Sequence, residues 1–306
     1  MNSFVLDEQD FSILLDFKNC QGTFLTPKEA IKKYINELVR KYPPPYTLFA
    51  SGGIDSQVMI HSFIHADVPF KIKSVRFANN LNQHDLKTLD KFALANNLFV
   101  QYEEIDIIDF FENNLIDYVK QYKCSSPQIC AHMNWVDKFA EGTCVFSGVA
   151  PCIWGLEFTQ DNLPFYDYAV DKPLIPFFLL QDSEVCSSFF NLQRNILDQN
   201  RNQPSIDEML PQGYATYHFK SLLYKAAGFE IIPQDLKLSG FELVKEYYDN
   251  FPERVTKFDR LKYSDRPSPR IFDIIFRYKM EDITKVNRKT FRFTLPELYK
   301  YSYVVY

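Results

Sequence analysis

The chain has 306 residues, enough for one large domain or two small ones with a packed core. Apolar residues make up 46%, and 34 Lys and Arg against 39 Asp and Glu give a net charge of −5. This acidity disfavours bulk nucleic-acid binding, which needs a basic surface. No apolar run reaches the roughly 18 residues of a membrane span, and the acidic N-terminus does not resemble a secretion signal. We therefore expect a cytoplasmic protein with no membrane partner.

Residues 1–45 are expected to form an N-terminal extension of one strand and one helix. A short apolar run at 11–17 predicts the strand. Three signals predict the start of the helix: Thr26 as N-cap, a proline after it, and Glu29 in capping-box spacing. Three consecutive prolines at 43–45 end it.

Residues 46–150 alternate between strand and helix patterns. Strands are predicted at 46–50, 70–77, 98–105 and 144–147, and helices at 57–66, 84–97, 108–122 and 126–141. Strands separated by helices imply crossover connections, and therefore a mostly parallel sheet covered on both faces. This region is predicted to be a doubly wound, Rossmann-like α/β domain.

Residues 151–306 are expected to form a mainly helical accessory or substrate region. The segment 151–180 is rich in proline and aromatic residues and is predicted to be a long ordered loop. Helices are predicted at 182–199, 214–227 and 240–250, the last with Ser239 and Glu242 in capping-box spacing. The Arg- and Tyr-rich tail from Lys262 is predicted to pack on the core or on a partner.

One stretch predicts a binding site: Ser51-Gly-Gly-Ile-Asp-Ser56, between a strand and a helix. The chain has only 9 glycines, where average usage of about 7% gives roughly twenty, and two of them are adjacent here. Glycines let successive backbone N–H groups approach an anion, and the following helix adds its positive end. The two serine hydroxyls can donate to phosphate. Asp55 needs a cation between itself and phosphate, which predicts Mg²⁺.

SGGIDS resembles the SGGxDS signature of the PP-loop ATP pyrophosphatases, the adenine nucleotide alpha hydrolase-like superfamily. In this family ATP lies with its pyrophosphate in the loop, and a substrate oxygen attacks the α-phosphorus to give substrate–AMP and Mg-pyrophosphate. Ammonia or sulfur then often displaces AMP. The resemblance implies ATP and Mg²⁺ as cofactors, with Asp55 as the metal ligand. It also implies these nucleotide-binding residues: Ser51, Gly52, Gly53, Ile54, Asp55, Ser56, Phe77, Ser147 and Gly148.

By position, the adenine would lie near Arg76, Phe77 and Ala78. The family also has a late strand that ends in a small-residue turn, which Val145-Phe-Ser-Gly-Val149 fits. In asparagine-synthetase-like members that turn carries an acidic residue that helps to hold metal. Here the acid is missing, and Glu157 and Asp161 are the nearby substitutes.

Catalysis is expected to rest on positioning and charge neutralisation. Asp55 and Ser56 would act on the pyrophosphate, and a lysine from the C-terminal half would offset its charge. Lys237, which precedes a predicted helix and a glycine, is the preferred lysine, with Lys225 and Lys220 as alternatives.

Other reactive side chains are interpreted as structural. His61 and His65 are four apart on a helix, but no third zinc ligand is identified. His132 and Trp135 are assigned to core packing in preference to a substrate contact. The cysteines contain no CxxC pair and are interpreted as reduced thiols: Cys20, Cys124, Cys130, Cys144, Cys152 and Cys186. The close pairs 124/130 and 144/152 leave a metal or redox role open.

The predicted function is an AMP-forming, ATP-dependent ligase acting on a small molecule, nearest the asparagine synthetase-like and 7-cyano-7-deazaguanine synthase-like branches. The isoleucine of the motif favours these branches and NAD synthetase over sulfate-reducing members. No cysteine stands at position 2, so a glutaminase of the asparagine synthetase type is not expected, and ammonia or sulfur would come from a separate donor. The four-cysteine zinc site of a deazaguanine synthase is also missing.

Two alternatives remain open. The first is a nucleotide-binding or structural protein without catalysis, which the missing acid after Gly148 favours. The second is a tRNA-thiolating enzyme, which would need a reactive thiol at Cys124, Cys130, Cys144 or Cys152 and a tRNA partner. The acceptor substrate and the oligomeric state are not predicted.

Overall fold

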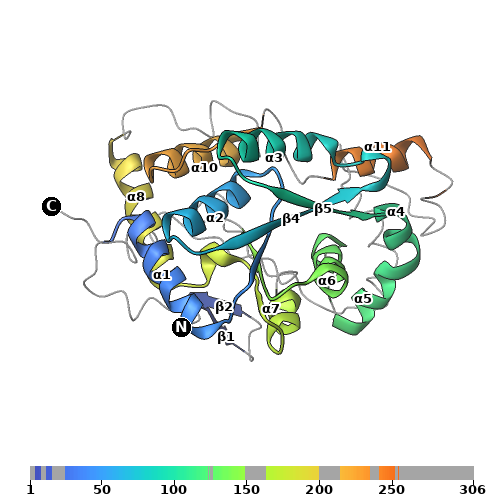
Figure 1. Ribbon diagram of the computed structural model, residues 1–306, viewed down its shortest axis with the longest axis horizontal. Helices are drawn as coiled ribbons and strands as arrows, with labels where there is room; N and C mark the ends of the chain where they lie inside the picture. The colour runs from blue at the N-terminus through green and yellow to red at the C-terminus, as the bar shows by residue number, and fades with distance from the viewer. Residues whose placement is uncertain are drawn as a thin grey trace.

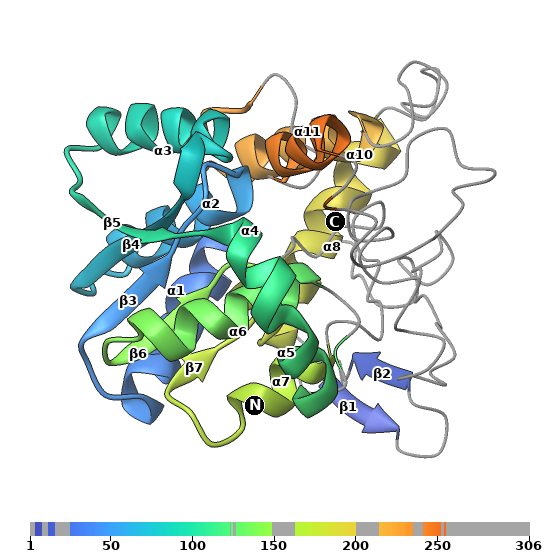
Figure 2. The same ribbon diagram turned by 90° about the vertical axis from the view of Figure 1, so that its right-hand side faces the viewer.

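The computed structural model describes residues 4–7, 12–15, 25–122, 124, 127–148, 163–199, 214–234, 241–251 and 254. Its centre is a five-stranded sheet in the order β5-β4-β3-β6-β7, in which every pairing is parallel. The strands are β3 (Tyr46–Phe49), β4 (Phe70–Phe77), β5 (Val100–Ile105), β6 (Thr143–Phe146) and β7 (Leu174–Ile175). A separate antiparallel hairpin consists of β1 (Phe4–Asp7) and β2 (Ser12–Leu15), as Figure 2 shows.

Helices cover both faces of the sheet, which confirms the predicted doubly wound α/β class (Figure 1). One face packs mainly against α1 (Pro27–Lys41), α2 (Ile54–His65), α3 (Gln83–Ala95), α8 (Ser183–Gln199) and α10 (Tyr214–Ala226). The other packs mainly against α4 (Ile107–Asp109), η2 (Phe110–Asn114), α5 (Leu115–Tyr122), α6 (Pro127–Phe139), α7 (Leu163–Ala169) and α11 (Glu242–Asn250). Short 3₁₀ turns lie at η1 (Ala78–Asn80) and η4 (Phe178–Leu180).

The helix predicted from Thr26 is confirmed as α1, with both capping-box bonds formed. The Thr26 N–H donates to Glu29 Oε2 over 2.9 Å, and the Glu29 N–H donates to Thr26 Oγ1 over 3.4 Å. These two bonds satisfy backbone donors that the first turn of a helix otherwise leaves open.

Three predictions are corrected. The segment 151–180 is not wholly a loop, because α7, β7 and η4 lie within it and β7 completes the sheet. This strand has only two residues, too few for a periodic pattern. The strand β1 was not predicted. The last helix begins at Glu242 with Phe241 as its N-cap, two residues later than predicted, and the predicted capping box stays a prediction because Ser239 lies outside the described residues.

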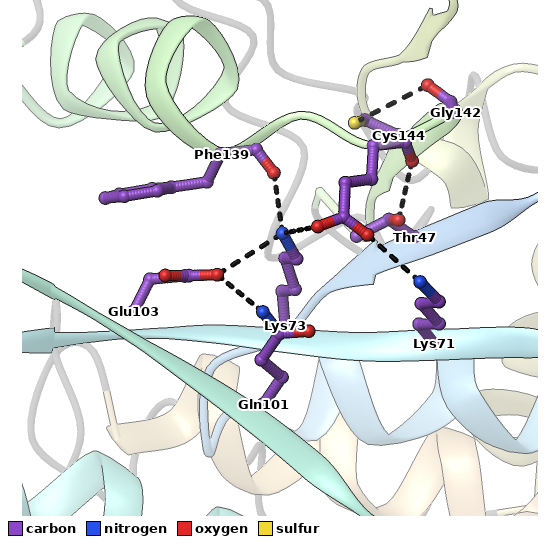
Figure 3. A network of polar contacts seen from close by, with 9 residues as sticks. Thr47, Lys71, Lys73, Gln101, Glu103, Phe139, Gly142 and Cys144 are labelled. Atoms are coloured by element: carbon purple, nitrogen blue, oxygen red, sulfur yellow. Dashed lines mark hydrogen bonds and ion pairs between the residues drawn. The ribbon is translucent and has the colours of Figure 1, made fainter.

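An ion cluster around the buried Lys73 side chain, here called the Lys73 cluster, lies on the sheet face that α6 covers (Figure 3). The Lys73 ammonium contacts Glu141 at 2.8 Å and Glu103 at 3.3 Å, and donates to the Phe139 carbonyl over 3.0 Å. Burial lowers the pKa of Lys73, but its hydrogen bonds to the two carboxylates outweigh burial and the pKa is raised. The cluster joins β4, β5 and the end of α6.

Among the described residues, no helix combines the length and apolarity needed to cross a membrane.

Candidate nucleotide-phosphate site

The SGGIDS loop lies where the strand order reverses. The chain runs from β3 outward to β4 and β5, and returns on the other side of β3 as β6 and β7. In open parallel sheets, the crevice beyond the carboxyl ends of the strands at such a point is where ligands bind. The loop joins the end of β3 to α2, which begins at Ile54 with Gly53 as its N-cap. No side chain caps Gly53, so the first N–H groups of α2 are directed into this region.

Three serine hydroxyls converge on the loop. The Ser56 hydroxyl oxygen accepts from the Ser51 N–H over 3.2 Å and lies 3.3 Å from Ser51 Oγ. It also lies 3.4 Å from Ser147 Oγ, which comes from the turn after β6. The structure therefore brings together the two predicted small-residue turns, which stand 91 positions apart in the sequence.

Two glycines of the site cannot carry a side chain. A Cβ on Gly52 would lie 2.1 Å from the Asp85 carbonyl oxygen, because the start of α3 packs against the loop. Gly148 has φ +68°, and its Cβ would lie 2.5 Å from Phe177 Cα. Close backbone packing accounts for both glycines.

Asp55 is held by two residues of α10, and these three residues are here called the Asp55 cluster. Asp55 Oδ2 lies 2.6 Å from the Lys220 ammonium, and Oδ1 accepts from the Tyr224 hydroxyl. Lys220 and Tyr224 stand four residues apart, so they share one face of the helix. Both ionic side chains are largely buried, with 11% of Lys220 and 21% of Asp55 exposed. Of the lysine candidates that lie among the described residues, Lys220 and Lys225, it is Lys220 whose ammonium lies at the loop.

The segment after α10 supports the loop through Gln57, which is fully buried. Gln57 Nε2 donates to the Gly52 carbonyl over 3.0 Å and to the Ile232 carbonyl over 2.8 Å. Gln57 Oε1 accepts from the Ile232 N–H over 2.7 Å. These bonds tie the loop backbone at Gly52 to the segment after α10. The position of the loop therefore does not depend only on the contacts among its serine hydroxyls.

The predicted site residues fall into three groups. Seven of them lie together in the loop after β3, the first turn of α2 and the turn after β6: Ser51, Gly52, Gly53, Asp55, Ser56, Ser147 and Gly148. The side chains of Ile54 and Phe77 are buried in the core, with the Phe77 ring 5.3 Å from that of Phe241. Lys237, Glu157 and Asp161 lie outside the described residues. The roles given to these residues stay predictions.

Lys225, the remaining lysine candidate, and Arg76, which was expected near the adenine, both lie at the surface. Lys225 is exposed beside a shallow pocket that includes Gly228 and Phe229. Arg76 contacts Glu104 at 3.9 Å and lies over the Tyr102 ring.

Sequence reasoning missed Tyr224 and Gln57. Tyr224 stands one helical turn after Lys220, which is the only signal available for it in the sequence. Gln57 directly follows the motif, but nothing in the sequence identifies its distant backbone partner at Ile232.

The structure supports structural roles for the histidines. The His61 ring nitrogen Nε2 lies 2.6 Å from the Glu230 carbonyl oxygen, and burial lowers the pKa of this histidine. His132 packs between Trp135 and Phe146, with ring centroids 4.7 and 5.3 Å away.

Four of the cysteines are buried: Cys124, Cys130, Cys144 and Cys186. Burial raises the pKa of Cys144 to about 11. A thiol with such a pKa is a poor nucleophile at neutral pH. Cys20 and Cys152 lie outside the described residues.

The described residues provide no ready metal site. Within them, no group of three or more His, Cys, Asp or Glu side chains is placed to hold an ion. Both carboxylate oxygens of Asp55 already have partners, and the cation that contacts this side chain is Lys220. The assignment of Mg²⁺ to Asp55 therefore stays a prediction.

Fold and site together define an α/β protein with a loop rich in glycine and serine at its topological switch point. No family model matches the chain, and no curated protein matches it. Among solved structures, NMN synthetase from Francisella tularensis matches with TM-score 0.35 and 16% identity, over 79% of this chain and 99% of that one. NH3-dependent NAD synthetase from Campylobacter jejuni matches with TM-score 0.33 and 14% identity, over 82% of this chain and 99% of that one.

Glutamine-dependent NAD⁺ synthetase from Acinetobacter baumannii matches with TM-score 0.30 and 14% identity, over 90% of this chain and 53% of that one. With TM-scores below 0.5, these likenesses support no statement about the activity of this chain.

Proposed function

We propose that the protein is an ATP pyrophosphatase that adenylates a small-molecule substrate and releases AMP and pyrophosphate. The observation that carries this proposal is the SGGIDS loop at the switch point, with the hydroxyls of Ser51, Ser56 and Ser147 converging on it. Backbone N–H groups, hydroxyls and a helix N-terminus are together the donors that bind phosphate oxygens.

In the proposed reaction, a substrate oxygen attacks the α-phosphorus, and the bond from that phosphorus to the bridging oxygen of pyrophosphate breaks. The loop holds the leaving pyrophosphate, and Ser56 fixes the loop's shape through its contacts with Ser51 and Ser147. Charge grows on the bridging oxygen as the bond breaks. Lys220, which Asp55 and the fold hold at the loop, offsets this charge. Mg²⁺, when bound with ATP, would supply further charge neutralisation.

The second half-reaction in this proposal is displacement of AMP by nitrogen. Ammonia attacks the substrate carbon that is bonded to the AMP oxygen, AMP leaves with the electrons of the broken C–O bond, one proton of the ammonia passes to solvent, and an amide or related product forms. The nitrogen comes from solution or from a separate donor protein. A sulfur donor is the alternative nucleophile.

The test is product analysis with ATP and Mg²⁺ against pools of amino acids and other small carboxylates, with and without ammonia. We expect AMP and pyrophosphate in equal amounts, and their loss in Asp55→Asn. Formation of ADP and phosphate would contradict the proposal. Repeating the assay with tRNA and a sulfur donor tests the thiolation alternative, which the burial of Cys124, Cys130 and Cys144 disfavours.

A second candidate function is nucleotide binding without chemistry. The engagement of both Asp55 oxygens by Lys220 and Tyr224 favours it, because a carboxylate so held is not open to a metal ion. ATP binding without release of pyrophosphate under all acceptor conditions would support this candidate.

A further inference from the structure

The Asp55 carboxylate is held at both of its oxygens by side chains from one helix. Oδ2 lies 2.6 Å from the Lys220 ammonium, and Oδ1 accepts from the Tyr224 hydroxyl. Asp55 stands in the first turn of α2, and α10 lies beside that helix (Figure 1). A carboxylate that ligates Mg²⁺ must present an oxygen to the ion, and here each oxygen already faces a donor hydrogen. The residues present therefore do not fit a metal ion at Asp55.

Tyr224 is fixed by its surroundings. Its side chain is 0% exposed, and its ring lies edge-on to the rings of Phe189 and Phe229, with centroids 5.9 and 6.4 Å away. Close packing of this kind holds a buried ring in one orientation. The bonds between Gln57 and Ile232 tie the segment after α10 to α2 at a second place. The Tyr224 hydroxyl is therefore held toward Asp55 by the fold.

Lys220 occupies the place that a metal ion would take at this carboxylate. An ammonium 2.6 Å from Oδ2 repels a second cation at the same oxygen. The lysine side chain is long and flexible, so an ammonium without an anchor would be spread over many positions. The bond to Asp55 restricts it to the loop and uses one of its three N–H donors. The carboxylate thus directs a positive charge to the site.

The same three residue types meet at a second place in the fold. Asp137 Oδ1 accepts from the Tyr168 hydroxyl over 2.5 Å and lies 3.4 Å from the Lys172 ammonium. Asp137 lies near the end of α6, which leads into the start of β6. Because β3 and β6 are parallel, this is the sheet edge opposite the SGGIDS loop. This second trio, here called the Asp137 cluster, provides a matched control.

We propose that Asp55 is a positioning residue for Lys220 and not a metal ligand, and that Tyr224 fixes Asp55 for this role. The Lys220 ammonium is a cation that the fold supplies in place of a metal ion at this carboxylate. The inference rests on the proposed function, because it takes the triphosphate to lie in the SGGIDS loop. Its consequence is that Asp55 acts on triphosphate binding through Lys220, with or without Mg²⁺.

The test measures the dissociation constant of inorganic tripolyphosphate in the parent protein, in Asp55→Asn, in Lys220→Gln and in the double variant. Each constant is measured with Mg²⁺ and with EDTA. In EDTA we expect it to rise about tenfold in Lys220→Gln, which loses a charged donor. It should rise by a smaller factor in Asp55→Asn, because Lys220 loses its anchor.

The double variant shows whether Asp55 acts through Lys220. Without the lysine charge, the Asp55 carboxylate is only a negative charge near an anion. Adding Asp55→Asn to Lys220→Gln should therefore tighten tripolyphosphate binding, although Asp55→Asn alone weakens it. The loss in Asp55→Asn should also have the same size with Mg²⁺ as with EDTA.

A metal ligand would behave differently. Its replacement would weaken binding with Mg²⁺ only, and by the same factor whether or not Lys220 is present. That result, or unchanged or tighter binding of Asp55→Asn in EDTA, overturns the inference and leaves the proposed function in place. Failure of tripolyphosphate to bind the parent protein in either condition overturns the proposed function, and the inference with it. Asp55→Ser replaces Asp55→Asn if circular dichroism shows that the asparagine variant does not fold.

Tyr224→Phe tests the hydroxyl alone. We expect severalfold weaker tripolyphosphate binding, equal with Mg²⁺ and EDTA, and no further loss when the change is added to Asp55→Asn. Tyr168→Phe removes the equivalent hydroxyl from the Asp137 cluster and should leave tripolyphosphate binding unchanged. Unchanged binding in Tyr224→Phe, or a loss that persists in the Asp55→Asn background, would overturn the role given to Tyr224.

Discussion

Two ionic clusters, built from similar side chains, lie in different surroundings in this molecule. In the Lys73 cluster one ammonium is shared by Glu103, Glu141 and a backbone carbonyl, and only 2% of the lysine is exposed. In the Asp55 cluster one carboxylate is held by Lys220 and Tyr224 at the loop. The Lys73 cluster joins strands β4 and β5 to the end of α6. The Asp55 cluster lies beside the N-terminus of α2 and the hydroxyls of Ser51, Ser56 and Ser147.

The difference shows that burial of a charge does not by itself mark a functional site. Every donor of Lys73 is directed at a protein acceptor, so the cluster has little left for a ligand. Within the part of the chain that the structure describes, the ammonium of Lys220 contacts one carboxylate, that of Asp55, and it lies near the hydroxyls and backbone N–H groups of the loop. We therefore propose that the Lys73 cluster contributes to stability and that the Asp55 cluster takes part in the proposed binding and catalysis.

The largest expected effect is that of Lys220→Met. Losing this cation should reduce pyrophosphate release by about 10²–10³-fold, as when one stabilising donor is removed from other active sites. Lys225→Met removes the same charge from an exposed position on the same helix and should leave the rate unchanged. Equal losses in the two variants would contradict a specific role for Lys220, and circular dichroism controls for folding.

Lys73→Met should have the opposite pattern of effects: it should lower stability and leave the rate of pyrophosphate release unchanged. We expect a loss of about 1–3 kcal/mol in the free energy of unfolding, because Glu103 and Glu141 lose their shared partner but keep access to water. The rate of pyrophosphate release per folded molecule should not change. Denaturant titration measures the loss, with the exposed Lys71→Met as the control that leaves the midpoint in place. A Lys73 variant that keeps its stability but loses activity would reverse our assignment.

The smallest expected effect is on the pH dependence of stability, through His61, which contacts the segment after α10 at Glu230. Burial lowers the pKa of His61 in the fold, so the unfolded chain binds a proton more readily. The contribution of His61 is therefore present above its ordinary pKa of about 6.5 and is lost as the pH falls toward the lowered value. The stability of the parent protein should fall more between pH 7.5 and 5.5 than that of His61→Gln. Identical pH profiles would show that His61 is not the group responsible.

The local features of this fold could be predicted from the sequence, because each rests on a short pattern. The capping box at Thr26 and the glycine pair at Gly52 and Gly53 need only their neighbours, and the alternation of strands and helices fixed the α/β class. The long-range contacts could not be predicted. Asp55 and Lys220 stand 165 positions apart, and nothing in α10 distinguishes Lys220 from Lys225 until the helix is packed.

Hydrogen exchange with and without ATP tests most directly whether the SGGIDS loop binds the triphosphate. We expect saturating ATP to slow exchange of the backbone amides of residues 51–57 and of 147–148, and to leave the amides around the Lys73 cluster unaffected. Asp55→Asn should weaken this protection. If saturating ATP leaves residues 51–57 exchanging as they do without it, the loop is not the phosphate site and the proposed chemistry is wrong.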